Sequence, residues 1–339
     1  MIFLDGSQGE GGGQIVRTAL TLSCVLGVPV QIENIRAGRK PSGLRPQHLT
    51  AIRAAAEICD AAVDGLQVGA RTVRFEPGGP AKPGQYEWAV GTAGSAPLVI
   101  QTVLLPLALA DGPSTIRVAG GTHVPGSPSG HYLRDVVMPV LLSMGADLEI
   151  YMEAYGWMPE GGGSMSVHLA GRATLAGLDM RDRGPIERVF GLAVGCNLPS
   201  HIPQRIANRA LNLLETMDAP LDIRPIRTRS ISTGAGIFLA VEYTNGRVGV
   251  GVLGRKGMPS ETVAEQAVTE LLELHDSGAA TDEHLADQLV VPLALAQGPS
   301  AYTTRTITPH LMTNVAVAQA FLDRPIALET RQRLVTIGE

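Results

Sequence analysis

Aromatic residues and cysteine are scarce in this chain of 339 residues. Phe, Trp and Tyr together account for only 4% of it, so the core must be mainly aliphatic and aromatic platforms for stacking nucleic-acid bases are few. The three cysteines, Cys24, Cys59 and Cys196, are far apart in the sequence, lie in apolar surroundings and have no CxxC spacing. This pattern excludes a disulfide scaffold and indicates buried thiols in a reducing compartment.

Sequence features of secretion and membrane insertion are also missing. The chain begins on a strand-like run, residues 1–5, without the basic and apolar regions of a signal peptide. The longest apolar stretch, residues 97–110, is interrupted by Gln101 and Pro106 and is shorter than the ~20 residues that a membrane-spanning helix requires. The sequence therefore predicts a soluble, cytoplasmic protein with no membrane partner.

Charged residues make up only 17% of the chain, and the net charge of −5 argues against a protein that coats nucleic acid. Residues 1–55 differ, because six basic residues oppose three acidic ones there and give a local charge of +3. The basic residues are Arg17, Arg36, Arg39, Lys40, Arg45 and Arg53, and the acidic ones are Asp5, Glu10 and Glu33. A local basic patch on an acidic chain suits a discrete phosphate site.

Glycine and hydrophobic residues are abundant. The chain has 40 Gly and 23 Pro beside 45% hydrophobic residues, which predicts many tight turns around a large core. An internal repeat is visible as well, because residues 106–114 and 292–300 match at eight of nine positions. Each copy predicts a helix that is ended by Gly112 or Gly298, since the proline that follows bars its continuation.

The same helix–glycine–strand order recurs along the chain. Strands are expected at 115–118 and 302–307 after the two repeat helices, and at 28–35 after an apolar run that ends at Gly27. A further copy is centred on Gly145. Repeated units of this kind predict an α/β fold in which βα units form sheets that are covered by helices.

Residues 184–276 break this order. We expect strands there at 189–194, 221–226, 237–243 and 247–253, and helices at 204–217 and 260–275. Asn245-Gly246 is a typical hairpin turn, and Ser260 is a candidate N-cap. Because the repeat resumes at 287–300, the sequence predicts a small inserted α/β domain, 184–276, within a large repeat-built domain of 1–183 and 277–339.

The N-terminal run Asp5-Gly-Ser-Gln-Gly-Glu10-Gly-Gly-Gly-Gln14 is the first candidate site. It follows a strand and opens a helix, which is the setting in which exposed N–H groups bind phosphate. Gln14 stands where a dinucleotide-binding fingerprint needs glycine, and no P-loop is present. Among glycines near phosphate, Glu10 is a sensible ligand for a hard divalent cation. A flexible turn is the alternative.

The second candidate is the segment from Arg36 to His48. It contains four cations within ten residues, separated by glycine and proline, and so can present guanidinium groups to phosphate oxygens. A solvated charged loop is the ordinary alternative. Beside the glycine run, however, the cluster favours a phosphate site.

His310 is expected in a loop after a repeat strand. The chain has no HExxH motif, no cysteine pair and no nearby Ser/Asp arrangement, so neither a zinc site nor a hydrolytic triad has support. Phosphate-binding elements with a loop histidine suggest an imidazole that attacks phosphorus to form a phosphoramidate. Two more loops, residues 119–128 with His123 and residues 155–163 with a glycine triplet, could line a ligand or be plain turns.

Six ordered motifs resemble the RNA 3′-terminal phosphate cyclase family, almost from end to end. They are the run Asp5–Gln14, Ile35-Arg-Ala-Gly-Arg39, Gln47-His-Leu-Thr, the glycine triplet from Gly161, Leu285-Ala-Asp-Gln288 and His310-Leu-Met-Thr-Asn314. The family's fold agrees with the prediction above, since it consists of repeated α/β units, as in enolpyruvyl transferases, with a small inserted domain.

The resemblance implies an ATP-dependent ligase that acts on RNA 3′-phosphate ends in three steps. First, His310 attacks the α-phosphorus of ATP and gives histidinyl–AMP and pyrophosphate. The AMP then passes to the RNA phosphate, forming an RNA(3′)pp(5′)A end. Finally, the adjacent 2′-hydroxyl attacks and leaves a 2′,3′-cyclic phosphate while AMP departs; this step needs little further orientation because its two groups are neighbours.

The resemblance also assigns roles to residues. Glu10 matches the family's metal-contacting glutamate, for Mg²⁺ or Mn²⁺, and His310 its nucleophile. The ATP- and phosphate-binding residues correspond to Arg17, Arg36, Arg39, Gln47, Gln101, Pro128, His284, Asp287 and Gln288. The repeat adds an independent argument, because at the offset of 186 Gln101 and Asp287 share one helical position, so we expect both to face one cleft.

Two residues depart from the family pattern. His284 replaces the tyrosine that usually stacks on adenine, and Tyr155 stands where the glycine-triplet motif normally has Arg or His. Two other functions stay open from sequence. One is a non-catalytic cyclase-like protein of ribosome assembly, although these lack the nucleophilic histidine; the other is an enolpyruvyl-transferase-like enzyme. The sequence also leaves open whether the chain is a monomer or a homodimer.

Overall fold

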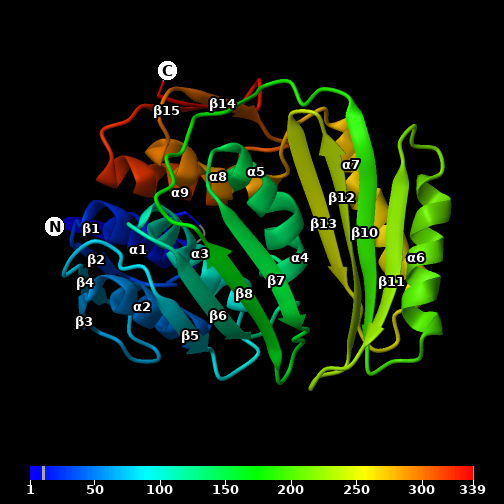
Figure 1. Cartoon of the computed structure of the whole chain (residues 1–339), viewed down its shortest axis with the longest axis horizontal. Helices are drawn as coiled ribbons and strands as arrows, with labels where there is room; N and C mark the ends of the chain where they lie inside the picture. Colours follow the sequence, from blue (N-terminus) through cyan, green and yellow to red (C-terminus); the bar gives the residue numbers. More distant parts are fainter. Residues whose placement is uncertain (10–11, 339) are drawn as a thin grey trace.

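The computed structural model describes residues 1–9 and 12–338. Outside residues 181–282, the chain forms three successive units, each with a four-stranded sheet and at least two helices (Figure 1). The first unit contains β1 (Ile2–Asp5), α1 (Gln14–Leu26), β2 (Val30–Glu33), α2 (Pro46–Cys59), β3 (Ala62–Asp64) and β4 (Val73–Glu76). The predicted α/β fold with sheets covered by helices is thus confirmed.

The second and third units follow the same plan. The second contains β5 (Gln85–Ala89), α3 (Ala96–Leu109), β6 (Ser114–Gly120), α4 (Gly130–Tyr132), the π-helix η1 (Leu133–Val137), α5 (Met138–Ser143), β7 (Leu148–Ala154) and β8 (Gly163–Leu169). The third contains β9 (Asp179–Met180), α8 (Glu283–Leu295), β14 (Ser300–Thr303), α9 (Pro309–Phe321), β15 (Ile326–Glu329) and β16 (Leu334–Ile337).

The three sheets share one topology. Their strand orders are β1-β2-β4-β3, β5-β6-β8-β7 and β9-β14-β16-β15. In each, the first two strands are parallel and the other pairs are antiparallel. The helix–glycine–strand segment around Gly145 belongs to the second half of the second unit, between α5 and β7. The described chain therefore repeats a six-element plan three times.

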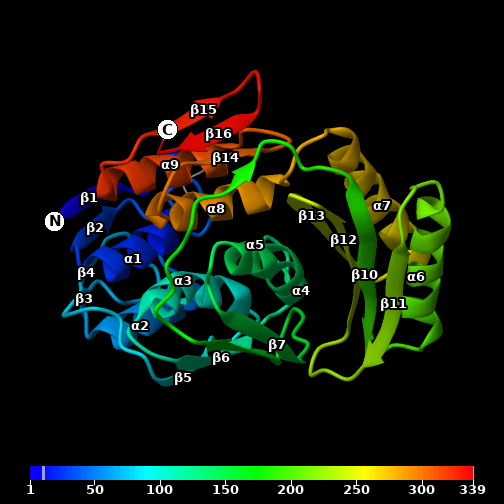
Figure 2. The same ribbon diagram turned by 45° about the horizontal axis from the view of Figure 1, so that its top comes forward.

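An inserted segment separates β9 from α8 in the third unit. It contains β10 (Ile186–Cys196), α6 (His201–Leu214), β11 (Leu221–Thr228), β12 (Gly234–Tyr243), β13 (Gly246–Leu253) and α7 (Ser260–Asp276). Its sheet has the order β11-β10-β12-β13, and α6 and α7 cover its outer face, away from α4 and α5 (Figure 2). We propose that this segment is the inserted domain, with the predicted limits 184 and 276.

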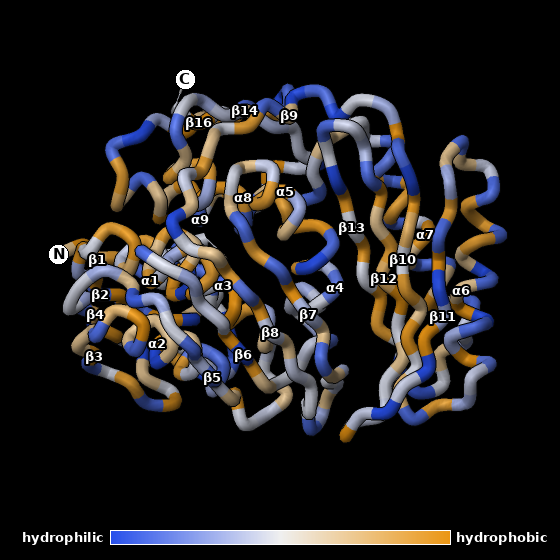
Figure 3. Tube along the Cα trace, viewed as in Figure 1, coloured by the Kyte–Doolittle hydropathy of each residue, from blue (hydrophilic) through white to orange (hydrophobic). Residues whose placement is uncertain are grey.

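Buried hydrophobic side chains form the core between helices and sheets. Hydrophobic residues recur along the helices and strands in the chain trace of Figure 3. One cluster extends through all three units, and a second lies between the inserted sheet and its own two helices. All three cysteines are free and buried, as expected. The sequence did not show that Cys24 of α1 and Cys59 of α2 are adjacent, with 3.7 Å between their sulfurs. Within residues 1–9 and 12–338, no helix is both long and apolar enough to cross a membrane.

Helix ends differ from the sequence prediction at the repeat. Gly27 ends α1 in the left-handed region at φ 66°, as predicted. However, α3 and α8 end at Leu109 and Leu295, three residues before Gly112 and Gly298. In α3 the reason is a change of partner, because its last carbonyls accept hydrogen bonds from the backbone N–H groups of residues 172 and 173. The chain therefore leaves the helix before the glycine.

Three further predictions need correction. Tyr243 pairs with Gly246, so the hairpin turn is Thr244-Asn245, one residue earlier than expected. Ser260 is the first helical residue of α7 rather than its N-cap, which is Pro259 and offers no side-chain acceptor. The strand expected at 302–307 ends at Thr303.

Candidate active site

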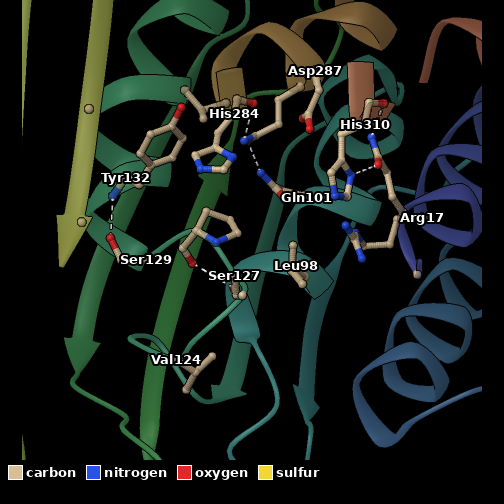
Figure 4. Close-up of a pocket in the computed structure, with 18 of the residues that line it drawn as sticks. Arg17, Leu98, Gln101, Val124, Ser127, Ser129, Tyr132, His284, Asp287 and His310 are labelled. Carbon is tan, nitrogen blue, oxygen red and sulfur yellow. Dashed lines mark hydrogen bonds between the residues drawn. The ribbon is translucent and has the colours of Figure 1, made fainter. Parts of the chain in front are cut away.

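A cavity of about 1010 Å³ lies between the three units and the inserted sheet (Figure 4). It is lined by every described residue that the sequence assigned to ATP or phosphate, and by the proposed nucleophile. These are Arg17, Arg36, Arg39, Gln47, Gln101, Pro128, His284, Asp287, Gln288 and His310. Glu10, the predicted metal contact, lies outside the described residues. The cavity thus brings together residues from distant parts of the chain.

Helix N-terminal halves provide most of these side chains. Arg17 comes from the first turns of α1, Gln47 from the start of α2, and His284 from the start of α8. An α-helix carries partial positive charge at its N-terminus, so these helix starts favour an anionic ligand. The repeat prediction holds as well, because Gln101 of α3 and Asp287 of α8 both line the cavity.

His310 lies in the first turn of α9, not in a loop as the sequence predicted. The helix begins at Pro309 because the Thr308 side chain caps it by accepting a hydrogen bond from the Leu311 N–H at 3.1 Å. This cap fixes the backbone of His310 and directs its ring toward the cavity. Helix geometry, rather than a loop, therefore positions the ring.

Gln14 of α1 holds the His310 imidazole in one orientation. Its Nε2 donates to the His310 carbonyl oxygen at 3.0 Å, which turns its Oε1 toward the ring, and Oε1 is hydrogen-bonded to Nδ1. An amide oxygen can only accept, so Nδ1 carries a proton, and whenever the ring is neutral the lone pair is on Nε2. The neutral ring is thereby set in the tautomer that a nucleophilic Nε2 requires.

Arg17 is the cation from α1 on the same side of the cavity as His310 (Figure 4). Burial lowers its pKa to about 10, while the carboxylate of Asp287 acts in the opposite direction. The guanidinium is therefore charged at neutral pH, although it is poorly solvated. Asn314 fixes Asp287 and α1 together, since it donates to the Asp287 carbonyl at 2.8 Å and accepts from Thr18 at 2.7 Å.

Three more arginines and a histidine follow α1 around the cavity. Arg36 donates to the carbonyls of Pro41 and Gly43 at 2.9 and 3.0 Å, which holds the loop before α2 in shape. Burial, and then the charges of Arg45 and Arg39, lower the pKa of Arg36. Such mutual repulsion between cations is relieved when an anion binds among them.

His48 of α2 is buried behind these arginines. Its Nδ1 accepts a hydrogen bond from the Arg45 backbone N–H at 3.0 Å. Burial first, and then Arg17, Arg36 and Arg45, lower its pKa to about 3, so the ring is neutral at neutral pH. Of the basic cluster predicted from the sequence, Arg36, Arg39 and Arg45 therefore line the cavity, whereas Lys40 is exposed and does not line it.

Another side of the cavity is made by the loop after β6 and by α8. Pro128 lines the cavity there, and Gln47 secures this side because its Oε1 accepts from the Ser95 backbone N–H at 3.0 Å. Gln101 donates to Gln288, which joins α3 to α8 across the cavity. The sequence assigned each of these four lining residues to one pocket, and the structure places them around one.

His284 lies edge-on to Tyr132, with 6.2 Å between ring centroids and 85° between planes. Tyr132 in turn donates to Asp282, the N-cap of α8, at 2.6 Å. The buried Asp282 also accepts from the Gly249 backbone N–H of β13 at 2.9 Å. This carboxylate therefore connects the start of α8 to the inserted sheet.

The N-terminal glycines differ in how closely other atoms approach them. A Cβ on Gly13 would lie 2.1 Å from His48 Nε2, and one on Gly9 would lie 2.1 Å from Thr313 Oγ1. A Cβ on Gly12 would meet nothing within 4 Å, although Gly12 lines the cavity. The close neighbours of Gly9 and Gly13 are thus side chains of this chain, and Gly12 leaves room for a ligand.

The two remaining candidate loops differ in whether they line the cavity. Within the loop at 119–128, residues 123–128 line the cavity. In the loop at 155–163, Gly161 and Gly162 have φ of 79° and 74° and pack against Ala93 and Ile231, so the triplet fits the turn interpretation. Tyr155 of this loop does not line the cavity, but its hydroxyl lies 3.2 Å from Nε2 of His131, which does.

The residues described here do not by themselves form a metal site. No group of three or more His, Cys, Asp or Glu side chains that could hold a metal ion occurs within residues 1–9 and 12–338. The carboxylates that line the cavity in that part of the chain are Glu270 and Asp287. A metal role for Glu10 therefore stays a prediction.

Sequence reasoning missed three residues that organise the site, namely Gln14, His48 and Asp282. Gln14 was visible only as the residue that broke a dinucleotide-binding pattern, and its tie to His310 spans 296 positions. His48 was the last residue of the basic segment. Asp282 precedes α8 and offers an N-cap pattern, which could have identified it.

Comparisons with known proteins identify the family of this chain. A family model described as RNA 3′-terminal phosphate cyclase matches residues 8–328. Proteins of that name from Trichormus variabilis and Methylococcus capsulatus are 47% and 46% identical, covering 100% and 95% of this chain and 99% and 91% of their own lengths. One from Caldivirga maquilingensis is 40% identical, over 96% of this chain and 94% of its own.

Among solved structures, the enolpyruvyl transferase NikO from Streptomyces tendae matches with a TM-score of 0.30 and 21% identity. That match covers 50% of this chain and 33% of that one, and it is too weak to bear on fold or activity. The family model and the relatives instead agree over nearly the whole length. This chain belongs to the RNA 3′-terminal phosphate cyclase family.

Proposed function

We propose that this chain converts an RNA 3′-terminal phosphate to a 2′,3′-cyclic phosphate in an ATP-dependent reaction. Family membership supports the overall reaction. The observation on which the mechanism depends is the Gln14–His310 pair, which sets an imidazole in its Nδ1–H tautomer in a cavity lined by arginines.

In the first step, Nε2 of His310 attacks the α-phosphorus of ATP. A P–N bond forms, the bond from the α-phosphorus to the bridging oxygen breaks, and pyrophosphate leaves. The ring gains positive charge as the bond forms, and Gln14 Oε1, which accepts from Nδ1–H, stabilises that charge. Arg17 and the arginines before α2 would neutralise the phosphate oxygens, as fixed cations in a partly desolvated site do.

In the second step, an oxygen of the RNA 3′-phosphate attacks the same phosphorus and the P–N bond breaks. The RNA then ends in (3′)pp(5′)A, and His310 regains its lone pair. In the third step, the 2′-hydroxyl oxygen attacks the 3′-phosphorus, its proton passes to solvent, and AMP leaves. Adenylylation is needed because a phosphate monoester dianion is a poor electrophile without a leaving group.

ATP is the substrate that supplies the adenylyl group, and we propose that it acts with Mg²⁺ or Mn²⁺. The carboxylates that line the described part of the cavity, Glu270 and Asp287, are not grouped with a third ligand. The arginines that line the cavity would therefore neutralise the charge of the phosphates.

Incubation with α-labelled ATP and Mg²⁺ or Mn²⁺ tests the nucleophile. We expect the protein to become labelled through an acid-labile, base-stable bond, with one added AMP in the intact mass and the label on the peptide that contains His310. The His310→Ala variant should lose the label. His168→Ala, at an exposed histidine on β8, is the matched control and should be labelled like the wild type.

Labelling that survives His310→Ala would refute the assignment of the nucleophile. The two alternative functions give a different outcome, since neither a non-catalytic relative nor an enolpyruvyl-transferase-like enzyme forms a covalent nucleotide. A wild-type protein that takes up no AMP but binds RNA would favour the former.

A further inference from the structure

The inserted sheet presents one of its faces to the cavity. Residues that pair directly across strands share a face, so the registers of β10, β12 and β13 define rows across the sheet. Two adjacent rows line the cavity in full, and we name them the apolar wall: Leu192, Phe238 and Gly251, then Val194, Gly236 and Leu253. The alternate residues of these strands face α6 and α7.

The apolar wall has no polar side-chain atom. Its two glycines sit beside larger residues, with Gly251 next to Phe238 and Gly236 between Val194 and Leu253. A Cβ on Gly251 would meet nothing within 4 Å, and its φ lies outside the left-handed region, so local backbone geometry does not require glycine there. Phe238 and Val194 are buried, so the accessible part of the apolar wall consists of Leu192, Gly251 and Leu253. The open space at Gly251, beside these two leucines, is where a flat, apolar group could fit.

Contacts place the wall next to the nucleotide region. The Phe238 ring lies 6.5 Å from that of Tyr132, and Tyr132 lies 6.2 Å from His284. Figure 4 shows Tyr132 and His284 on one side of the pocket and His310 with Arg17 on the other. A molecule on the wall would thus share the cavity with a nucleotide bound at His310.

Charge separates the two sides of the cavity. The arginines come from α1 and the loop before α2, whereas the wall adds no charge. Two titratable rings lie next to Phe238 on the large-domain side, Tyr132 at 6.5 Å, whose pKa is raised by burial, and His131 at 6.1 Å. Burial and the charge of Arg134 lower the pKa of His131 to about 3. That ring is neutral at physiological pH. Phosphates are favoured at the arginines, while the wall favours an uncharged, apolar ligand.

We propose that the apolar wall binds the base of the RNA's 3′-terminal nucleotide, and so directs the 3′-phosphate toward the nucleotide at His310. The proposal rests on the function proposed above, whose second step needs the RNA end and the adenylyl group in one cavity. An unstacked base has a flat, weakly polar face, and covering that face with apolar surface is favourable whichever base is present. The inserted sheet would thereby position RNA, while the three units bind ATP.

Replacement of Gly251 tests the wall without touching the nucleotide region. We expect Gly251→Leu to fill the open space and to lower kcat/KM for cyclisation of a short RNA 3′-phosphate about tenfold, the size of one lost base contact. Self-adenylylation requires no RNA and should change less than twofold. Gly251→Ala should give a smaller loss, and Gly79→Leu, at another glycine whose Cβ meets nothing within 4 Å, should give none.

An oligonucleotide with an abasic 3′-terminal nucleotide identifies what the wall binds. If the wall contacts the base, wild-type enzyme should lose about tenfold with the abasic substrate, and Gly251→Leu should add little to that loss, because both changes remove one interaction. Fluorescence anisotropy of the same RNA without ATP should show parallel losses in affinity, which gives a measurement independent of adenylylation.

Three results would overturn the proposal. Unchanged RNA affinity and cyclisation in Gly251→Leu would show that the wall is not used, and independent losses from the variant and the abasic substrate would show that it binds something other than the base. Equal losses in self-adenylylation and transfer would assign the wall to ATP. Failure of the proposed function is distinct, because it appears as absent labelling in the wild type, and the anisotropy measurement still reports whether the wall binds the base.

Discussion

The two sides of the cavity are built in different ways. The side around His310 uses helix starts from repeated units, and its side chains are joined by hydrogen bonds such as Gln14–His310 and Asn314–Asp287. The side of the inserted sheet uses strand rows with glycines and hydrophobic residues. Covalent chemistry needs fixed orientation and charge, whereas acceptance of many RNA ends needs only a surface of suitable shape.

The strongest test of this contrast is Gln14→Leu. Loss of the amide acceptor leaves the His310 ring free to adopt the other tautomer and to rotate, so we expect self-adenylylation to fall about 10- to 100-fold, as for other partners that orient a reactive histidine. RNA affinity, which the opposite side is proposed to provide, should stay the same. The rate of labelling and RNA anisotropy check the two halves of this prediction.

Gln14→Glu provides a matched comparison, because a carboxylate can still accept from Nδ1–H. We expect partial recovery of labelling and a pH profile that differs from that of the wild type, because the carboxylate places a negative charge beside the His310 ring. If Gln14→Leu labels at the wild-type rate, Gln14 does not position the nucleophile.

The next largest expected effect is that protonation of His48 makes the free energy of unfolding depend on pH. Its pKa is about 3 in the folded protein against about 6.5 when unfolded, so the unfolded state takes up the proton first as pH falls. His48 therefore contributes full stability above pH 6.5 and loses it progressively down to pH 3. At pH 5 the loss should be about 2 kcal/mol in the free energy of unfolding.

Urea unfolding at pH 7 and pH 5 checks this expectation. His48→Gln keeps an acceptor for the Arg45 N–H but cannot be protonated, so its stability should fall less between the two pH values than that of the wild type. The exposed His168→Gln is the control and should leave the pH dependence unchanged. If the free energy of unfolding falls equally between pH 7 and pH 5 in the wild type and in His48→Gln, His48 is not a buried, neutral histidine.

Much of this architecture could be read from the sequence. The repeat at 106–114 and 292–300 predicted equivalent helices, and Gln101 and Asp287 on those helices do line one cavity. Hydrophobic periodicity and turn residues predicted the strands and helices of residues 184–276, because such patterns reflect contacts within a few residues. Helix ends were less predictable, since the last carbonyls of α3 are bound by residues 172 and 173, far along the chain.

The site residues also divide into those that short sequence motifs predicted and those that depend on contacts between distant segments. Arginines and glycines in short motifs were visible, but the neighbours of His310 and His48 were not. Gln14 reaches His310 only when the first and third units pack together, and Gly13 lies against His48 only when α1 and α2 pack within the first unit. The apolar wall was also hidden. In the sequence its residues are ordinary strand positions, and only the strand registers of the folded sheet show that they share a face.

The smallest expected effect is a difference in the free energy of unfolding between alanine variants of two glycines, one from each side of the cavity. At Gly13 a Cβ would lie 2.1 Å from the buried His48 ring, so Gly13→Ala must displace it, and we expect a loss of about 1 kcal/mol in the free energy of unfolding. At Gly251 a Cβ meets nothing within 4 Å, so Gly251→Ala should change stability by less than about 0.5 kcal/mol. Urea midpoints at pH 7 measure both, and equal destabilisation would remove the distinction between a packed nucleotide side and an open RNA side.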